Sequence, residues 1–367
     1  MDTTMDVIKD WFRRQFSDPQ AVILLVILVT GSAIVLFLGD MLAPVLASVV
    51  IAYLLEGLVC ILERRRVPRL VAVLLVFTSF LVFVTFLLLG LLPLLWQQVG
   101  QLVQQLPSMI TWIQKELSRL PERYPDYVSQ QQILDVMNVL RAELTSLGQR
   151  VVTFSVASVR SIITIGVYMV LVPFLVFFLL KDKERIITWL TRFMPEDRSL
   201  AVQVWTEVDR QIGNYIRGKV WEILIVWAVS YVAFAILGLQ FAMLLSFFIG
   251  VSVLIPYIGA IFMTLPVVLI GYFQWGWSSD FGYLVITYVI IQTLDGNILA
   301  PLLCSEAVNL HPLAVIVAIL VFGGMWGFWG LFFAIPLASL VQAVIHAWPA
   351  RNVKNVEPPY APEPAEE

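Results

Sequence analysis

The sequence predicts an all-α polytopic membrane protein with about eight transmembrane helices. Of its 367 residues, 60% are hydrophobic and only 13% are charged. Several apolar runs exceed the roughly 20 residues that a helix needs to cross a bilayer core of about 30 Å. These runs are continuous and lack the alternating segments of about 10 residues that are typical of a membrane β-barrel. Helices are therefore the spanning elements, because they satisfy their own backbone hydrogen bonds in lipid.

Three spans are predicted near the N-terminus. The first is Ala21–Leu38, and Gly39-Asp40 is predicted to form a tight turn into the second, Met41–Leu55. The basic loop Glu63–Arg69 then leads to a third span, which begins at Leu70 and ends near residue 95. Another apolar run follows the first within a few residues, so we interpret the first as a retained span and not as a cleaved signal peptide.

An amphipathic segment follows at residues 96–160. Apolar residues recur there at helical spacing, with glutamine and charged residues between them. Pro107, Pro121 and Pro125 divide the segment. We predict two or three amphipathic helices at or above the membrane surface, which either cap the protein's own spans or contact a partner.

The fourth span, Ser161–Leu180, ends at a charged segment that reaches Lys219. The last part of that segment, Ser199–Lys219, is predicted to be one helix that feeds directly into a fifth span, Val220–Leu239.

Two apolar runs near the C-terminus are too long for one straight span. Phe241–Phe273 has 33 residues and Leu313–Ala347 has 35, so each would extend about 50 Å as a single helix. Each is predicted to be either a broken, tilted helix or a hairpin that enters and leaves on one side. The predicted helix-breaking or gating residues are Pro256, Tyr257, Gly259, Pro266, Pro301, Pro312, Gly323, Gly324, Gly330 and Pro336.

The two runs also share a short local likeness. The segment Gly259–Pro266 aligns with Gly330–Pro336 with a difference of one residue in spacing. Paired segments that glycine and proline interrupt are a sequence indicator of a transporter binding site. Chance is the alternative, because glycine, phenylalanine and proline are common in membrane spans.

A polar stretch, Gln292–Pro312, lies between these runs, in a region without lysine or arginine from Val220 to Ala350. Polar groups at membrane depth are costly and mark the path of a solute or ion. Asp295 lies within a predicted span, on the same helix face as Gln292. We predict a polar-solute or cation site, or a proton-coupling carboxylate; the alternative is a helix end in the headgroup region. The candidate residues are Gln292, Asp295, Asn297, Glu306 and His311.

The distribution of basic residues predicts the orientation. Seventeen of the 23 lysines and arginines fall on one side of the membrane if the spans alternate. The positive-inside rule places that side, with both termini, in the cytoplasm and residues 96–160 outside. The side that residues 301–311 face stays open, because it depends on whether Phe241–Phe273 is a hairpin.

Enzymatic, metal-binding and nucleic-acid-binding functions have little support in the sequence. It contains no Walker motif and no HExxH motif. Cys60 and Cys304 are too few and too far apart for a zinc site or a disulfide framework. We expect no enzyme activity, no cofactor and no nucleic-acid partner. The predicted partners are the lipid bilayer and a small polar solute, with possible coupling to H⁺ or Na⁺.

Several short motifs together give the chain a family resemblance over residues 20–348. They are Pro173-Phe174 through Phe177 to Asp182, Tyr215–Gly218, Ile255–Gly259, Gln292 through Asp295 to Pro301, Leu310–Leu313, and Gly330 to Leu337. With these motifs the chain resembles the autoinducer-2 exporter family, also described as PerM-like permeases. One departure is Glu56, where the family pattern leads us to expect a proline.

The resemblance implies an inner-membrane permease of about eight spans, a homo-oligomer that is possibly pentameric, and export of a small polar quorum-sensing signal. Some relatives resemble Na⁺(Li⁺)/H⁺ antiporters, so antiport is an alternative function. A channel or a membrane scaffold without transport activity is a second alternative. The predicted organisation is spans 1–3 (1–95), an amphipathic segment (96–160), span 4 with charged helices (161–219), a transport bundle (220–348) and a disordered acidic tail (349–367).

Overall fold

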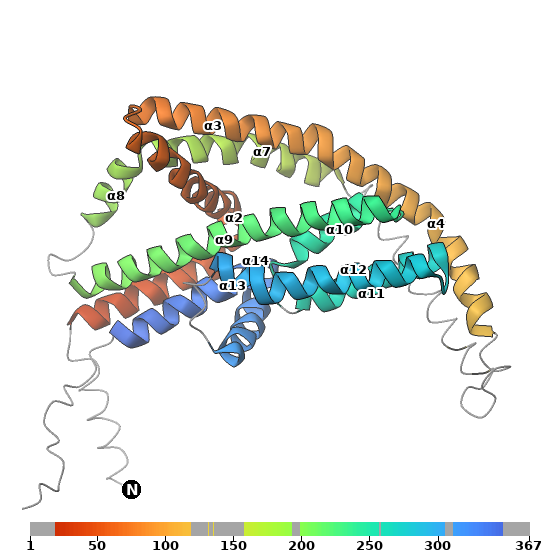
Figure 1. The fold of residues 1–367 in the computed structure, drawn as a ribbon. Helices are drawn as coiled ribbons and strands as arrows, with labels where there is room; N and C mark the ends of the chain where they lie inside the picture. Colours follow the sequence, from red (N-terminus) through yellow and green to blue (C-terminus); the bar gives the residue numbers. More distant parts are fainter. Residues whose placement is uncertain are drawn as a thin grey trace, which may run out of the picture. The chain divides into compact units, whose positions relative to one another are not determined.

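The computed structural model describes residues 19–118, 131, 135, 158–192, 199–256, 258–304 and 311–347. Throughout this part of the chain the regular elements are helices (Figure 1). They are α2 (Pro19–Arg64), α3 (Arg69–Phe86), α4 (Leu92–Ser118), α7 (Ser158–Lys181), α8 (Lys183–Thr191), α9 (Ser199–Leu237), α10 (Ala242–Ser252), α11 (Ile258–Trp275), α12 (Ser279–Leu294), α13 (Ala300–Cys304) and α14 (Pro312–Ala347). Two π-helical segments, Leu87–Leu91 and Asp295–Leu299, join α3 to α4 and α12 to α13.

The length and composition of these helices confirm an all-α polytopic membrane protein. Five of the described helical stretches are long and apolar enough to cross a membrane: Met41–Arg64, Arg69–Lys115, Asp209–Leu237, Ile258–Trp275 and Ser279–Leu303. The shorter apolar helices are Gly166–Lys181, Ala242–Ser252, Leu313–Gly327 and Gly330–Val344. By their contacts the residues form two compact units, one from 1–39, 190–212 and 307–367, the other from 40–189 and 213–306.

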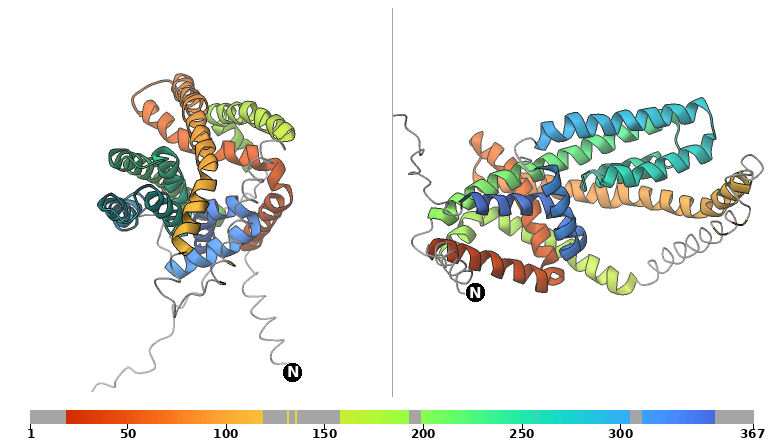
Figure 2. Two further views of the ribbon diagram at one scale, coloured as in Figure 1. Left: turned by 90° about the vertical axis from the view of Figure 1, so that its right-hand side faces the viewer. Right: turned by 90° about the horizontal axis from the view of Figure 1, so that it is seen from below.

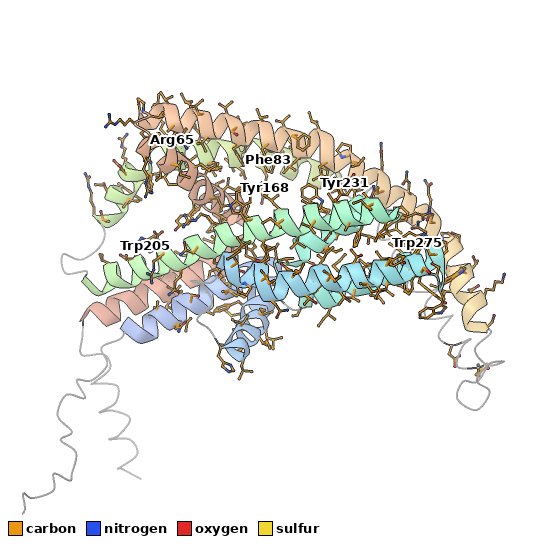
Figure 3. All side chains as sticks on the ribbon, in the orientation of Figure 1. Arg65, Phe83, Tyr168, Trp205, Tyr231 and Trp275 are labelled. Carbon is orange, nitrogen blue, oxygen red and sulfur yellow. The ribbon has the colours of Figure 1, made fainter. Side chains whose placement is uncertain are left out.

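The first two predicted spans belong to one continuous helix. α2 remains helical through Gly39 and Asp40, so the tight turn predicted there is wrong. A glycine inside a helix costs only about 1 kcal/mol relative to alanine, and the apolar residues on both sides favour continuation of the helix. α2 ends at Arg64, and the basic loop that follows includes Arg65, which is labelled in Figure 3.

Glu56 holds three helix ends together near that loop. Its Oε1 accepts hydrogen bonds from Arg69 Nη2 at 3.3 Å and from Lys183 Nζ at 3.0 Å. Arg69 Nη2 also donates to the backbone oxygen of Leu180 at 3.0 Å. Glu56 therefore pairs with the basic loop through Arg69. Below this cluster, α3 and α7 lie side by side (Figure 1) and share a buried apolar core with α2.

The amphipathic segment continues the third span in its described part. α3, the π-helical turn and α4 run on to Ser118 without a break, and Pro107 lies inside α4. Gln98 Oε1 accepts a hydrogen bond from the backbone nitrogen of Leu244 at 2.9 Å, and the Trp112 ring packs edge-on against Tyr272. Of the two predicted alternatives, packing against the protein's own helices therefore holds for residues 96–118, and α4 continues the third span instead of forming a separate helix. Most of residues 119–160 lie outside the described residues.

α9 confirms the predicted junction between the charged segment and the fifth span. It runs from Ser199 to Leu237 and passes through Lys219 without interruption. Gly250 permits close packing of α10 on this helix, because a Cβ at that position would meet the backbone oxygen of Ile223. The resulting core is formed by α9, α10, α11 and α12 together with Leu91 and Leu95.

The run Phe241–Phe273 forms a helical hairpin. α10 and α11 pack against each other, and the chain bends between Val253 and Pro256. The two ends of the run meet, because Gln274 accepts a hydrogen bond from the backbone nitrogen of Gln240 at 2.8 Å and donates one to the backbone oxygen of Gly238 at 2.9 Å. Of the two predicted alternatives, the hairpin therefore holds. α11 then leads into α12, which returns alongside it (Figure 2), and Trp275 marks this end of the pair in Figure 3.

Glycines and not the internal prolines produce the close turns in both long runs. Gly259 abuts the backbone oxygen of Ser252, leaving no room for a Cβ. In α14, Gly327 has φ +57° and ψ −131° and divides the run into two arms. Pro266 and Pro336 lie inside helices, so the prediction that they interrupt the runs is wrong. Membrane helices tolerate proline because neighbouring groups satisfy the backbone carbonyl that it frees.

Candidate functional site

Gln292 lies near the end of α12, and the helix changes its form immediately after it. The Ser278 side chain caps the start of the helix by accepting a hydrogen bond from the backbone nitrogen of Phe281 at 3.3 Å. At Asp295 the helix changes to a π-helical segment that ends at Leu299. Gly296 follows the acid within this segment. Such π-helical turns are frequent at functional sites.

Asp295 and Gln292 each contribute a buried polar atom with no hydrogen-bond partner among the described residues. These atoms are Oδ1 of Asp295 and Nε2 of Gln292. The two residues are three apart on one helix, so they share a face. One atom is an acceptor and the other a donor. An unsatisfied buried polar group costs roughly 1–3 kcal/mol. A bound solute that forms hydrogen bonds with these two atoms would remove that cost.

A buried ion pair on α9 lies within electrostatic reach of Asp295. Lys219 Nζ is 3.0 Å from Glu222 Oε1 and 2.9 Å from Oε2. The two residues are only 6% and 1% exposed, so most of the water around both charges has been removed. Asp295 interacts electrostatically with both members of the pair. The cluster of these three residues carries a formal net charge of −1.

The ion pair is also tied to the bend of the first hairpin. Lys219 Nζ donates a hydrogen bond to the backbone oxygen of Val253 at 3.1 Å. The last turn of a helix leaves carbonyl groups without intrahelical partners, and here a buried ammonium satisfies one of them. The hairpin bend and the fifth span therefore meet at this buried ion pair.

Tyr288 links α12 to α11 one turn before Gln292. Its hydroxyl donates a hydrogen bond to the backbone oxygen of Ala260 at 2.9 Å and lies 3.3 Å from Thr264 Oγ1. Tyr288 is buried, so these bonds fix the rotation of α12 relative to α11. That rotation directs the face with Gln292 and Asp295.

Two other predicted site residues, Asn297 and His311, bond to their own helix ends and not to this cluster. Asn297 is exposed, and its Nδ2 donates a hydrogen bond to the backbone oxygen of Thr293 on its own helix at 2.9 Å. His311 is exposed and accepts a hydrogen bond from the backbone nitrogen of Leu313 at 3.2 Å at the start of α14. Glu306 and Tyr257 lie outside the described residues.

The predicted breaking residues are distributed as follows. Pro256 lies in the hairpin bend, Pro301 in α13, and Pro312 begins α14. Gly323 faces the Leu331 side chain across the bend of α14, whereas Gly324 has open space around it.

Sequence reasoning missed Lys219 and Glu222. The signal was present in the spacing, since Lys219 and Glu222 are three residues apart at the start of an apolar run and carry opposite charges. Among the described residues no group of three or more histidine, cysteine or acidic side chains could hold a metal ion.

Comparison with known proteins agrees with this architecture. Residues 23–350 match the model of the AI-2E family transporter. The chain belongs to this transporter family. It is 46% identical over 348 residues to PerM of Escherichia coli strain K12, which is named as a permease, covering 94% of this chain and 98% of that protein. It is 28% identical over 318 residues to YueF of Bacillus subtilis strain 168, which is named as a transport protein, covering 84% of each chain.

Membership in the AI-2E family and the apolar helices together establish a multi-pass membrane protein of a transporter family. The autoinducer-2 exporter resemblance found in the sequence is thereby confirmed at the level of the family.

Proposed function

We propose that this AI-2E family member is a secondary transporter of the bacterial inner membrane that exports a small polar solute similar to autoinducer-2. The observation that carries the proposal is the unused donor and acceptor at Gln292 Nε2 and Asp295 Oδ1. A hydroxyl group both accepts and donates a hydrogen bond, so solute hydroxyls match both the donor and the acceptor. The proposed substrate is therefore hydroxyl-rich and sugar-like.

Proteoliposomes test this function. Purified protein is reconstituted with autoinducer-2 inside, and efflux is measured for wild type, Asp295→Asn, Gln292→Leu and Asp280→Asn. Asp280 is an exposed acid on the same helix, so its variant is the matched control. We expect at least a tenfold loss of efflux for the two site variants and no loss for the control. Equal efflux in all four proteins would refute the site, and absence of wild-type efflux would refute the proposed substrate.

A Na⁺(Li⁺)/H⁺ antiporter is the second candidate function. It is favoured by the net negative charge of the buried cluster of Lys219, Glu222 and Asp295, because buried carboxylates bind protons and cations. Na⁺-dependent proton movement in the same proteoliposomes tests it, and Asp295→Asn is expected to abolish that movement. Retained solute efflux with lost proton coupling would instead favour a solute exporter in which Asp295 couples transport to a cation. Flux without coupling would indicate a channel, and no flux of any solute a scaffold.

We further propose that both termini and residues 301–311 face the cytoplasm. The positive-inside rule supports the position of the termini, and a hairpin at Phe241–Phe273 returns α12 toward the side from which α9 starts. Cys304 offers the test once Cys60 is replaced. An impermeant thiol reagent should label Cys304 in inverted vesicles and not in intact cells; the reverse pattern would overturn this orientation.

The family resemblance also leads us to propose a homo-oligomer of five copies. Native mass spectrometry of the protein in detergent should give a pentamer mass, and a monomer mass would refute it.

A further inference from the structure

Three oxygen atoms surround the ammonium of Lys219. Glu222 provides Oε1 at 3.0 Å and Oε2 at 2.9 Å, and Val253 provides its backbone oxygen at 3.1 Å. The donors come from α9 and from the bend that follows α10. Carboxylate and carbonyl oxygens at a helix break are the usual ligands of cations that transporters bind. The ammonium therefore occupies a position that suits a small cation.

The surroundings exclude water from this position. Glu222 is 1% exposed and Lys219 is 6% exposed. Glu222 cannot remain ionised there without a positive charge beside it, because an unpaired buried charge is strongly unfavourable. If Lys219 leaves, Glu222 must either bind another cation or take up a proton.

Asp295 gives the cluster a net negative charge that Lys219 alone does not balance. Its Oδ1 is buried without a partner in the described residues. Its charge interacts electrostatically with those of Lys219 and Glu222. The polar side chains that link α11 to α12, Tyr288 and Thr264, are neutral and bonded to each other, and Tyr288 also bonds to Ala260. Neither of them supplies the missing positive charge.

We propose that Lys219 is a tethered cation that occupies a monovalent-cation site formed by Glu222 and the Val253 carbonyl, with Asp295 as a neighbouring negative charge, and that a bound Na⁺ or Li⁺ competes with its ammonium for these oxygens. With Lys219 in place, the cluster has room for one further positive charge at Asp295. Ca²⁺ and Mg²⁺ fit poorly, because Ca²⁺ takes six to eight oxygen ligands and Mg²⁺ requires an octahedron. The inference rests on the proposed transport function only for its use in coupling; binding itself is measured without transport.

The competition gives Lys219 a positioning role in the hairpin. While its ammonium bonds to Val253, the bend between α10 and α11 is fixed to α9. When a cation replaces the ammonium, the same carbonyl binds the cation instead. Cation exchange at this site therefore connects the charge state of the cluster to the hairpin bend.

Thermal melting of the full-length protein in detergent tests the proposal. NaCl or LiCl is titrated against choline chloride at constant ionic strength. Lys219→Met removes the competing ammonium and leaves its oxygen partners, so we expect the half-saturating Na⁺ concentration to fall at least tenfold. Lys219→Met/Glu222→Gln is expected to lose that gain. Asp295→Asn keeps the ion pair and makes the cluster neutral, so any Na⁺ response of the wild type should disappear.

Several outcomes would overturn the proposal. One is a Lys219→Met variant whose Na⁺ dependence equals that of the wild type, or that cannot be purified folded even in saturating Na⁺. Another is an Asp295→Asn variant that keeps the wild-type response. A stronger response to CaCl₂ than to NaCl in Lys219→Met would contradict the monovalent assignment. Solute efflux by wild type without any of these cation responses would refute this inference and leave the proposed export function intact.

Discussion

In both long apolar runs a glycine lies against a backbone carbonyl group beside the bend, but the chemical surroundings of the two bends differ. In the first, Gly259 follows the bend and abuts the backbone oxygen of Ser252; in the second, Gly330 follows the bend and abuts that of Phe322. In both places a Cβ would overlap a carbonyl group of the preceding arm. The local likeness of Gly259–Pro266 and Gly330–Pro336 thus corresponds to a shared structural role.

The difference lies in what each bend contacts. The bend of the first hairpin is bonded to a buried ammonium through Val253. The second run contains no acidic or basic residue between Leu313 and Val344, and its turn is made by Gly327 with a positive φ. The comparison indicates that the glycine contacts form the hairpins, whereas charge supplied by α9 distinguishes the first hairpin chemically.

The largest expected effect is on the shared glycine contact. Gly259→Ala and Gly330→Ala each force a methyl group against backbone, and we expect a loss of about 3 kcal/mol or more, since overpacking a fitted site costs on this scale. Gly282→Ala and Gly324→Ala are matched controls, because a Cβ at either position meets open space. Size-exclusion chromatography and thermal melting in detergent measure the result. Wild-type melting of Gly330→Ala would show that the two hairpins are not equivalent.

The next largest effect separates the hairpins. Glu222→Gln leaves Lys219 buried beside an uncharged partner and should destabilise the protein by roughly 3 kcal/mol. Lys219→Met/Glu222→Leu replaces both charges with apolar groups and should recover all but about 1 kcal/mol of that loss. Hydrogen exchange should rise in α10 and α11 for Glu222→Gln and stay unchanged in α14. Equal exchange in both hairpins would contradict a contact specific to the first.

A smaller effect is expected where the first hairpin closes. Gln274→Leu removes two hydrogen bonds, to the Gln240 nitrogen and the Gly238 oxygen, each with a net value of about 1 kcal/mol. Gln240→Ala is the matched control, because Gln240 uses only its backbone nitrogen in this contact. Thermal melting should show a lower midpoint for Gln274→Leu alone. A similar decrease for both variants would mean that side-chain packing, and not these bonds, closes the hairpin.

The smallest effect is expected at Asn297. Its exposed side chain bonds only to its own helix, so Asn297→Ala should change efflux in proteoliposomes by less than about twofold and stability by about 1 kcal/mol or less. A tenfold loss of efflux would show that Asn297 belongs to the site with Gln292 and Asp295.

Much of the fold was predictable because lipid imposes strong local rules. Composition and run length led to an all-α membrane protein, and the continuity of α9 through Lys219 followed from an unbroken helical pattern. The same local rules failed at Gly39-Asp40, where a glycine and an acid did not end the helix. They failed again at Pro266 and Pro336, because tertiary neighbours compensate for the missing backbone donor.

Asp295 was predictable as a site residue because an acid within an apolar run is rare on energetic grounds. Its neighbours were not, because Lys219 and Glu222 lie more than 70 residues earlier in the chain. Only the folding of the hairpin between α9 and α12 brings these charges together.

The sequence by itself determined the fold class, the membrane location, the family and the apolar runs that must bend, since all four depend on composition and local pattern. Tertiary structure alone decided that Phe241–Phe273 closes on itself, that α4 packs on the protein's own helices, and that Asp295 lies near a buried ion pair. The physical reason is that hydrophobicity is a property of each segment, whereas the energy of a buried charge depends on which segment folds against it.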